Sequence, residues 1–431
     1  MPVAIRFNTI AVSALKLPVP PRIVAAALGL VLLAFAAPAT AQNNLALDNL
    51  RITLPEGKST LAIPHIEVTN TNLSREEFAR LFSADVPVDE GRALAERMKA
   101  DRISIPEAVL SSKDARITFG PFLASGIDAG RFQAVSLGGF NGTFSSEKTS
   151  EGKVSSGPLE LGGGNLAGLL SAARDGDMSG AAVQVSHVSW TGVEVTFADG
   201  ETPKSAPGGN LYHVKLGSLT NDTTYDGAIP VKSSGAFRSV VVEPPKASKF
   251  GKSLDSFGYQ RLDLGFSVAA SYDQKGRTLT LSDYTLSGAQ AGSLGLSGLL
   301  GSLDPAIFTA AGPLRLRALV NGDVSRFEAK FVNQGLFEKT LAYFAAQQKK
   351  SEAALKAEWS AMATQIFPIL LGGDPSALAL GQSLQSFIEN PRSLTISLKS
   401  RGAAVPLGQL QAIKDPATFL ALVEVTAKAN E

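Results

Sequence analysis

The chain contains no cysteine among its 431 residues. This absence excludes disulfide bonds, a thiol nucleophile, a cysteine-ligated metal site and the lipid-modified cysteine of a lipoprotein. Stability must therefore come from the packed core. A chain of this length can bury one large core or several smaller ones.

Histidine and the large aromatic residues are also scarce. The three histidines, His65, His187 and His213, are far apart and form no metal-binding or triad motif. Two tryptophans and six tyrosines offer few stacking platforms for a sugar-cleaving cleft. The sequence thus favours a non-enzymatic protein and singles out no catalytic residue. An envelope hydrolase or transferase that uses carboxylates stays open as an alternative, because acids distant in sequence can meet across a sheet.

Neither sign of charge dominates the chain. It carries 40 Lys and Arg against 39 Asp and Glu, a formal net charge of +1. No basic block is present, so nucleic acid is not expected as a partner. No motif indicates a cofactor.

The N-terminus has the pattern of an export signal. Residues 1–22 contain Arg6, Lys16 and Arg22 and no acid, and an apolar run follows at residues 23–37. Small residues at Ala39 and Ala41 match the pattern that signal peptidase cleaves. We therefore expect a signal peptide at residues 1–41, cleavage after Ala41, and a periplasmic protein with no transmembrane segment after cleavage. The alternative is an uncleaved membrane anchor, although the run is shorter than the roughly 20 residues that span a bilayer.

Alternating apolar residues predict an antiparallel hairpin in "RLDLGFSVAASYDQKGRTLTLSDYTL", with its turn at residues 273–276 and a left-handed Gly276. The apolar residues would share one face of a sheet. That face either forms the folding core or lines a groove for an acyl chain or a partner. Its members are Leu262, Leu264, Phe266, Val268, Leu279 and Leu281.

Further strands are expected at residues 115–120, 131–144, 210–219 and 237–244. A second hairpin is predicted in "PLRLRALVNGDVSRFEAKFV", with Asn321-Gly322 as its turn. "AAVQVSHVSWTGVEVTF" predicts two strands that meet near Thr191-Gly192.

Helical patterns lie near the N-terminal end of the β-rich region and after residue 335. Ser74 and Glu77 have the spacing of a capping box. Residues 336–350, 351–367 and 375–390 have apolar residues at helical spacing. We expect an α+β fold that is predominantly antiparallel β, with a large twisted or curled sheet and short interspersed helices. The division would be residues 1–41 as signal peptide, 42–335 as a β-rich domain and 336–431 as a helix-rich α+β region.

Two glycine-containing segments could bind ligands. The glycines at 292, 295 and 298 superficially suggest a phosphate loop, but their spacing is G-x-x-G-x-x-G and the leucines alternate around them. A strand is therefore the better interpretation. In "DGDMSG", Asp175, Asp177 and Ser179 resemble the start of a calcium loop, but Ser186 occupies the position of the bidentate glutamate.

The exported N-terminus, the short helices and strands such as "LDLGFSVAASYD" and "TLTLSDYTLSG" together resemble AsmA-like and related β-rich envelope proteins of Gram-negative bacteria. The resemblance is one of pattern over residues ~45–332. It implies a β-sheet groove whose apolar face handles lipid. The expected function is then an exported protein that binds lipid or another apolar ligand, or that serves as an envelope scaffold with a protein partner. A surface adhesin-like module is a further alternative.

Overall fold

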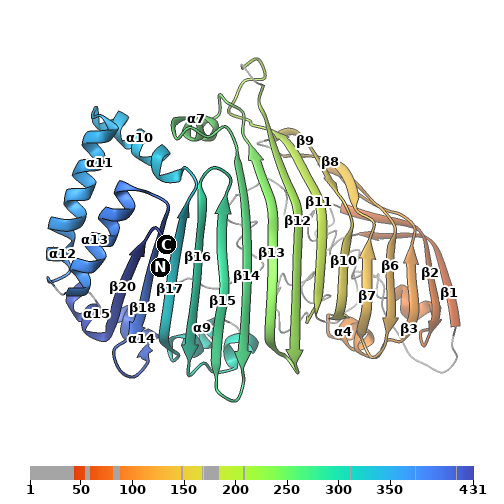
Figure 1. Cartoon of the computed structure of the whole chain (residues 1–431). Helices are drawn as coiled ribbons and strands as arrows, with labels where there is room; N and C mark the ends of the chain where they lie inside the picture. The colour runs from red at the N-terminus through yellow and green to blue at the C-terminus, as the bar shows by residue number, and fades with distance from the viewer. Residues whose placement is uncertain are drawn as a thin grey trace. The chain divides into compact units, whose positions relative to one another are not determined.

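The computed structural model describes residues 43–53, 59–80, 88–146, 149–166, 168, 184–206, 209–310, 312–373, 375–413 and 415–431. The predicted signal peptide lies outside these residues, as do the calcium candidates Asp175, Asp177 and Ser179. The described chain is mostly antiparallel β-sheet with several short helices, as predicted (Figure 1). It forms two compact units. Unit 1 comprises residues 1–203 and 210–215, and unit 2 comprises residues 204–209 and 216–431, so the boundary falls within strand β12 (Leu211–Asp226).

Within its described residues, unit 1 consists of strands that follow one another along the chain, with two helices between the second and third strands. The strands are β1 (Asn43–Thr53), β2 (Ser59–Thr71), β3 (Ala100–Ile105), β4 (Ala108–Ser112), β5 (Ala115–Phe119), β6 (Phe122–Ile127), β7 (Arg131–Leu137), β8 (Phe140–Ser146), β9 (Thr149–Ser156), β10 (Leu159–Asn165) and β11 (His187–Ala198). The helices are α3 (Arg75–Arg80) and α4 (Val88–Glu96).

From β3 to β10, the strands of unit 1 are successive halves of longer strands. β3 and β4 pair with one edge of β2 in a single unbroken register. The pairs β5–β6, β7–β8 and β9–β10 add to this sheet in the same way, and both halves of the last pair bond to β11. The breaks between the halves lie at residues 106–107, 120–121, 138–139 and 157–158.

These breaks are aligned across the sheet and form a line that we call the crease. Backbone hydrogen bonds join neighbouring breaks along this line: Gly120 N donates to Gly139 O at 2.8 Å, and Gly138 N donates to Pro121 O at 2.8 Å. Gly157 N donates to Gly192 O of β11 at 3.3 Å. Proline and glycine are suited to this line because a strand there must bend or give up a ladder bond.

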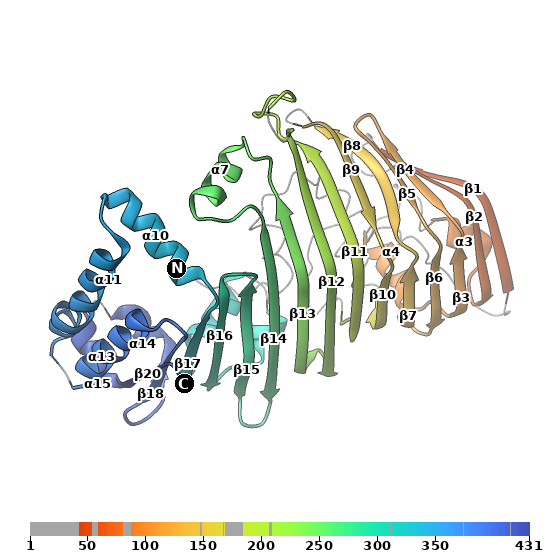
Figure 2. The ribbon, with the colours of Figure 1, turned by 45° about the horizontal axis from the view of Figure 1, so that its top comes forward.

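The crease changes which side of each strand is buried. Phe119 and Phe122 are both buried although they are three residues apart, and so are Leu137 and Phe140. In a straight strand, residues three apart point to opposite faces. The bend therefore turns the apolar sides of both halves toward one core. In Figure 2 the halves β4, β5, β8 and β9 lie above the halves β3, β6, β7 and β10.

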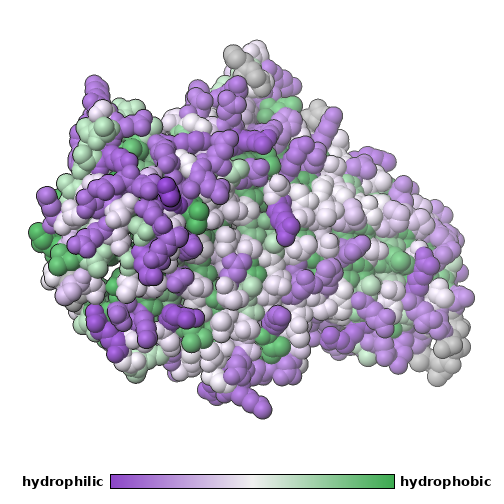
Figure 3. Space-filling model, viewed as in Figure 1, coloured by the Kyte–Doolittle hydropathy of each residue, from purple (hydrophilic) through white to green (hydrophobic). Residues whose placement is uncertain are grey.

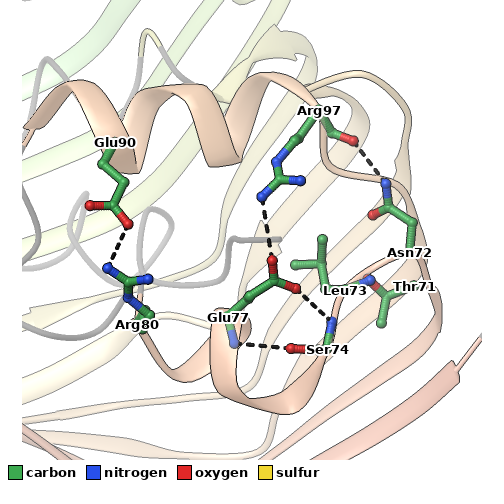
Figure 4. A network of polar contacts seen from close by, with 8 residues as sticks. All are labelled: Thr71, Asn72, Leu73, Ser74, Glu77, Arg80, Glu90 and Arg97. Carbon is green, nitrogen blue, oxygen red and sulfur yellow. Dashed lines mark hydrogen bonds and ion pairs between the residues drawn. The ribbon is translucent and has the colours of Figure 1, made fainter. Parts of the chain in front are cut away.

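The predicted capping box at the start of α3 is confirmed (Figure 4). Ser74 N donates to Glu77 Oε2 at 3.4 Å, and Glu77 N donates to Ser74 Oγ at 3.3 Å. Arg97 Nη2 lies 3.5 Å from Glu77 Oε1, and Arg80 Nη2 lies 2.7 Å from Oε1 of Glu90 on α4. These contacts hold the two short helices together beside the sheet.

Unit 2 is an antiparallel sheet with helices inserted between its later strands. The strands after β12 are β13 (Ile229–Glu243), β14 (Leu262–Asp273), β15 (Thr278–Gly288), β16 (Gly292–Gly301), β17 (Asp323–Asn333), β18 (Ser393–Ser400), β19 (Val405–Pro406) and β20 (Val423–Ala429). From β13 to β18 each pairs with the next, β20 pairs with β18, and β19 pairs with β17. The helices are α7 (Lys249–Ser256), α8 (Ala306–Thr309), α9 (Gly312–Val320), α10 (Leu336–Gln348), α11 (Glu352–Ala361), the π-helix η1 (Met362–Ile366), α12 (Phe367–Leu370), α13 (Pro375–Glu389), α14 (Leu407–Ala412) and α15 (Pro416–Leu422).

The first predicted hairpin is confirmed as β14 and β15, with Asp273 opposite Thr278. The left-handed residue of its turn is Arg277, with φ +48°, and not Gly276. Within the turn, the Asp273 carboxylate accepts a hydrogen bond from Lys275 N at 3.0 Å.

The second predicted hairpin is wrong. Residues 312–320 form helix α9, and β17 pairs with β16 instead. Leu and Arg favour a helix, and Pro313 fits its first turn, so the alternation of leucine and arginine was coincidental. Leu314 and Leu316 are both exposed on this helix.

Two other expectations concern glycine positions. The described part of residues 181–197 forms the single strand β11, not two strands, and Gly192 marks its passage through the crease with φ +64°. The glycines at 292, 295 and 298 lie in β16, which pairs with β15 and β17. The strand interpretation is therefore confirmed, and this segment is not a phosphate loop.

Candidate apolar binding site

The six predicted apolar residues lie on one face of the unit 2 sheet. Phe266 pairs with Leu286, and Tyr272 pairs with Leu279. A register shift between Ala269 and Ala270 compensates for an extra residue in β15, so the apolar side chains of both strands remain on the same face. Val268 is buried, and the other five predicted residues are half-buried.

The same face stays apolar in the following strands. Leu286 is opposite Leu294, which is opposite Phe331, which in turn is opposite Leu394. Side chains at alternate positions of these strands point to the other side of the sheet and are polar, such as Ser267, whose Oγ donates to Asp283 Oδ2 at 2.6 Å. We call the first side the apolar face. Its residues include Leu262, Leu264, Phe266, Val268, Leu279, Leu281, Leu286, Leu294, Leu296, Phe331, Leu394 and Ile396.

The apolar face is covered at one end and open at the other. Helix α13 packs on β20, and residues of the two elements share a buried cluster that consists of Ala377, Leu380, Val405, Leu420, Val423 and Val425. Further along the sheet, Leu286 is 47% exposed and Leu294 is 41% exposed. The two leucines face each other across β15 and β16, two residues from the turn that joins these strands.

Aromatic contacts fix the helices at both ends of these strands. Where β14 begins and β17 ends, Phe257 stacks on Tyr343 of α10 with ring centroids 4.0 Å apart, and Lys339 Nζ lies 3.5 Å from the centroid of the Tyr259 ring. At the opposite end, Tyr272 packs edge-on against Phe308 of α8. The Tyr272 hydroxyl donates to Leu303 O at 2.7 Å, and burial raises the pKa of this phenol.

Helices α11, η1, α12 and α13 form an antiparallel arrangement that we call the helical hairpin (Figure 1). Ser351 caps α11 by accepting a hydrogen bond from Ala354 N at 3.2 Å, as its position predicts. Between η1 and α13 the backbones approach so closely that a Cβ on Gly381 would overlap the carbonyl oxygen of Ala363. π-helices are rare and often occur at functional sites.

A cleft of about 220 Å³ lies within the helical hairpin, and every residue that lines it is apolar. The lining residues are Trp359, Met362, Ala363, Ile366, Phe367, Leu370, Leu384 and Ile388. Met362, Ile366, Phe367 and Leu370 are also exposed to solvent, so they form its mouth. Hydrophobic surface gathers at the left edge of Figure 3, at the position of α12 in Figure 1.

A row of aromatic rings connects the apolar face with the cleft. Ring centroids are 5.8 Å apart between Phe331 and Phe387, and 5.5 Å apart between Phe387 and Phe337. Phe337 then lies 5.9 Å from Trp359 in the cleft wall. Apolar side chains thus run without interruption from the open sheet to the hairpin.

Ionisable groups are not gathered at this site. Across the described residues, no group of three or more His, Asp and Glu side chains could hold a metal ion, and the buried polar side chains all belong to Ser and Thr. His65 lies elsewhere, on β2, with Asp48 at 2.6 Å and Glu67 at 3.2 Å. Hydrogen bonds to Asp48 and then Glu67 raise its pKa above 6.5.

The alternation of apolar and polar residues predicted the apolar face of the sheet but not the cleft, which lies between helices. The sequence does carry one signal for it: residues from Trp359 to Ile388 include a single charged residue, Asp374, in a chain that is 18% charged. No helix within the described ranges has both the length and the apolar character to cross a membrane.

A family model described only as an uncharacterised protein matches residues 285–430, which include the helical hairpin and the end of the sheet that it covers. No curated protein matches the chain.

Proposed function

We propose that the protein binds the acyl chain of a lipid, without catalysis, after export to the periplasm. The observation that carries the proposal is the apolar cleft, joined by a row of rings to an open apolar sheet face. In this proposal the curled sheet supplies the floor of the site, and the C-terminal helices supply its cover. The proposal agrees with what the resemblance to AsmA-like proteins implies.

The size of the cleft supports a partial acyl chain as its occupant. A volume of about 220 Å³ corresponds to roughly seven volumes of about 30 Å³, the share of one water molecule in the liquid. The end of a chain fits this space, and each buried methylene contributes about 0.8 kcal/mol. The remainder of the chain would lie over the aromatic row toward Leu286 and Leu294.

The lining of the cleft favours binding over hydrolysis. Glycoside or ester cleavage needs a carboxylate or another nucleophile beside the reacting bond. The cleft presents eight apolar side chains instead. A scaffold or adhesin role would not require an apolar cleft at all. A test of fatty acid binding in the cleft therefore separates these roles from lipid binding.

The two tryptophans allow a direct test. Trp359 lines the cleft, and Trp190 lies in unit 1, where its Nε1 donates to Ser156 Oγ. In the Trp190→Phe variant, a fatty acid brominated in the middle of its chain should quench Trp359 fluorescence in a saturable way. The unbrominated fatty acid should not quench it. The Trp359→Phe variant, which retains Trp190, should show no saturable quenching.

Filling the cleft provides the matched control. Leu384→Trp occupies the cleft and should abolish binding, measured by native mass spectrometry as loss of the protein–fatty acid complex. Leu384→Met, which keeps the volume, should retain binding. Quenching that is equal at both tryptophans, or a complex that survives Leu384→Trp, would show that the ligand does not bind in the cleft.

A further inference from the structure

We infer that the end of the helical hairpin docks on the surface of an anionic phospholipid bilayer. The inserting residues, which we call the apolar tip, are Met362, Ile366, Phe367, Ile369 and Leu370. The inference rests on the proposed function, because it identifies the source of the acyl chain. The chemistry of the tip can nevertheless be tested separately from that of the cleft.

The apolar tip projects from the helices and carries no charge. Ile369 is 76% exposed and Leu370 is 66% exposed, and the two residues are adjacent at the end of α12. Gly372 and Gly373 follow in left-handed conformation, with φ +80° and +70°, and turn the chain back toward α13. Residues 359–373 contain no Asp, Glu, Lys or Arg. An exposed, uncharged apolar turn is suited to insertion among lipid headgroups and acyl chains.

The extent of the tip favours a bilayer over a protein. A stable protein interface uses about 20–30 residues on each side. The exposed apolar tip comprises five residues, which alone would supply only a small part of such an interface. Insertion into lipid has no such requirement, because each buried apolar side chain contributes independently.

Arg401 supplies charge complementarity beside the tip. Its Nη2 lies 3.5 Å from Ser376 Oγ in the first turn of α13, and its Nε donates to Leu420 O at 2.9 Å. The residue is exposed. The guanidinium therefore lies beside the first turn of α13, three residues after the left-handed Gly373, where it can pair with a lipid phosphate while the tip is inserted.

Docking would place the mouth of the cleft against the bilayer. Met362, Ile366, Phe367 and Leu370 belong to both the mouth and the apolar tip. An acyl chain could therefore move from the bilayer into the cleft without crossing water. Ile369 belongs to the tip but does not line the cleft, so it reports on docking alone.

The absence of cysteine makes a site-specific test possible. Ile369→Cys in the full chain is labelled with an environment-sensitive fluorophore and mixed with vesicles of phosphatidylethanolamine that contain about a quarter phosphatidylglycerol. Leu314→Cys is the control, because Leu314 is 66% exposed, close to the 76% of Ile369, but lies on α9. We expect a blue shift and quenching by brominated lipid at position 369 and neither at position 314. This readout does not depend on whether the N-terminal segment also binds vesicles.

The contribution of Arg401 is measured in the same assay. Arg401→Gln should raise the lipid concentration for half-maximal blue shift at position 369 by about five-fold, because one cation near an anionic surface contributes on the order of 1 kcal/mol. Vesicles without phosphatidylglycerol should remove this difference between the two proteins.

Three results would overturn the inference: no shift at position 369, an equal shift at position 314, or a shift that appears without vesicles as protein concentration rises. The last result would assign the tip to a second copy of the chain. Free brominated fatty acid still reaches Trp359 if only docking fails, so the proposed function would then stand. If position 369 inserts but Trp359 is not quenched, docking stands and the proposed function fails.

Discussion

The crease of unit 1 predicts that two glycines on the same line respond very differently to alanine. At Gly139, φ is +101°, and a Cβ would overlap the carbonyl oxygen of Ser156 on the neighbouring strand. At Gly192, φ is +64°, and the nearest atom to a Cβ would be Gly157 N at an ordinary 3.5 Å. Both positions require a left-handed backbone conformation, but only at Gly139 is there also no space for a Cβ.

The expected losses follow from these two contributions. Alanine in the left-handed region costs about 1 kcal/mol, which is the whole effect at Gly192. At Gly139 the less favourable φ and the displacement of a strand add about 3 kcal/mol. A region of about 200 residues changes its melting temperature by about 2–4 °C per kcal/mol. Gly139→Ala should therefore melt about 6–12 °C below Gly192→Ala.

Trp190 is the natural reporter for this comparison, because it lies beside the crease and bonds to Ser156. In a Trp359→Phe background, its fluorescence follows unit 1 alone during urea or thermal unfolding. If Gly139→Ala loses no more free energy of unfolding than Gly192→Ala, the close packing that we assign to the crease is wrong.

Three further predictions concern single side chains. NMR titration should give His65 a pKa above 6.5, and Asp48→Asn should lower that pKa. Because the pKa of His65 is higher in the folded than in the unfolded protein, its protonation stabilises the fold fully below pH 6.5. This contribution is lost as the pH rises through the pKa of the folded protein. Ser248→Ala should lower the free energy of unfolding by about 1 kcal/mol in urea titrations, with rescue by threonine, because Ser248 Oγ caps α7 by accepting from Gly251 N at 2.9 Å. Leu355→Ala should cost about 2–5 kcal/mol by the same measurement, since Leu355 is fully buried between α10 and α11; a cost below 1 kcal/mol would show that these helices do not pack as described.

Local patterns predicted the parts of the fold that depend on neighbouring residues. Strict alternation was sufficient for β14 and β15, since one face is apolar and the other polar. The same rule failed at residues 312–320, where alternating leucine and arginine form α9. An exposed helix of this length has no apolar stripe to distinguish it from a strand.

The crease and the cleft could not be predicted because both depend on which segments pair. Gly120-Pro121 and Gly157-Pro158 are ordinary turn signals in the sequence. Only the pairing register of the strands shows that these two dipeptides interrupt long strands and lie opposite interruptions in the neighbouring strands. The cleft requires α11 and α13 to be antiparallel, whereas the apolar face needed only the strands that contain it.

The crease also determines how the two layers of unit 1 can separate. In a sandwich of two independent sheets, the layers are joined by loops and can slide apart when their interface weakens. Here the backbone of every long strand passes through both layers, so each strand is a covalent tether between them. We therefore expect amide protons in β5 and β6 to exchange with solvent at similar rates, because neither layer can open without the other.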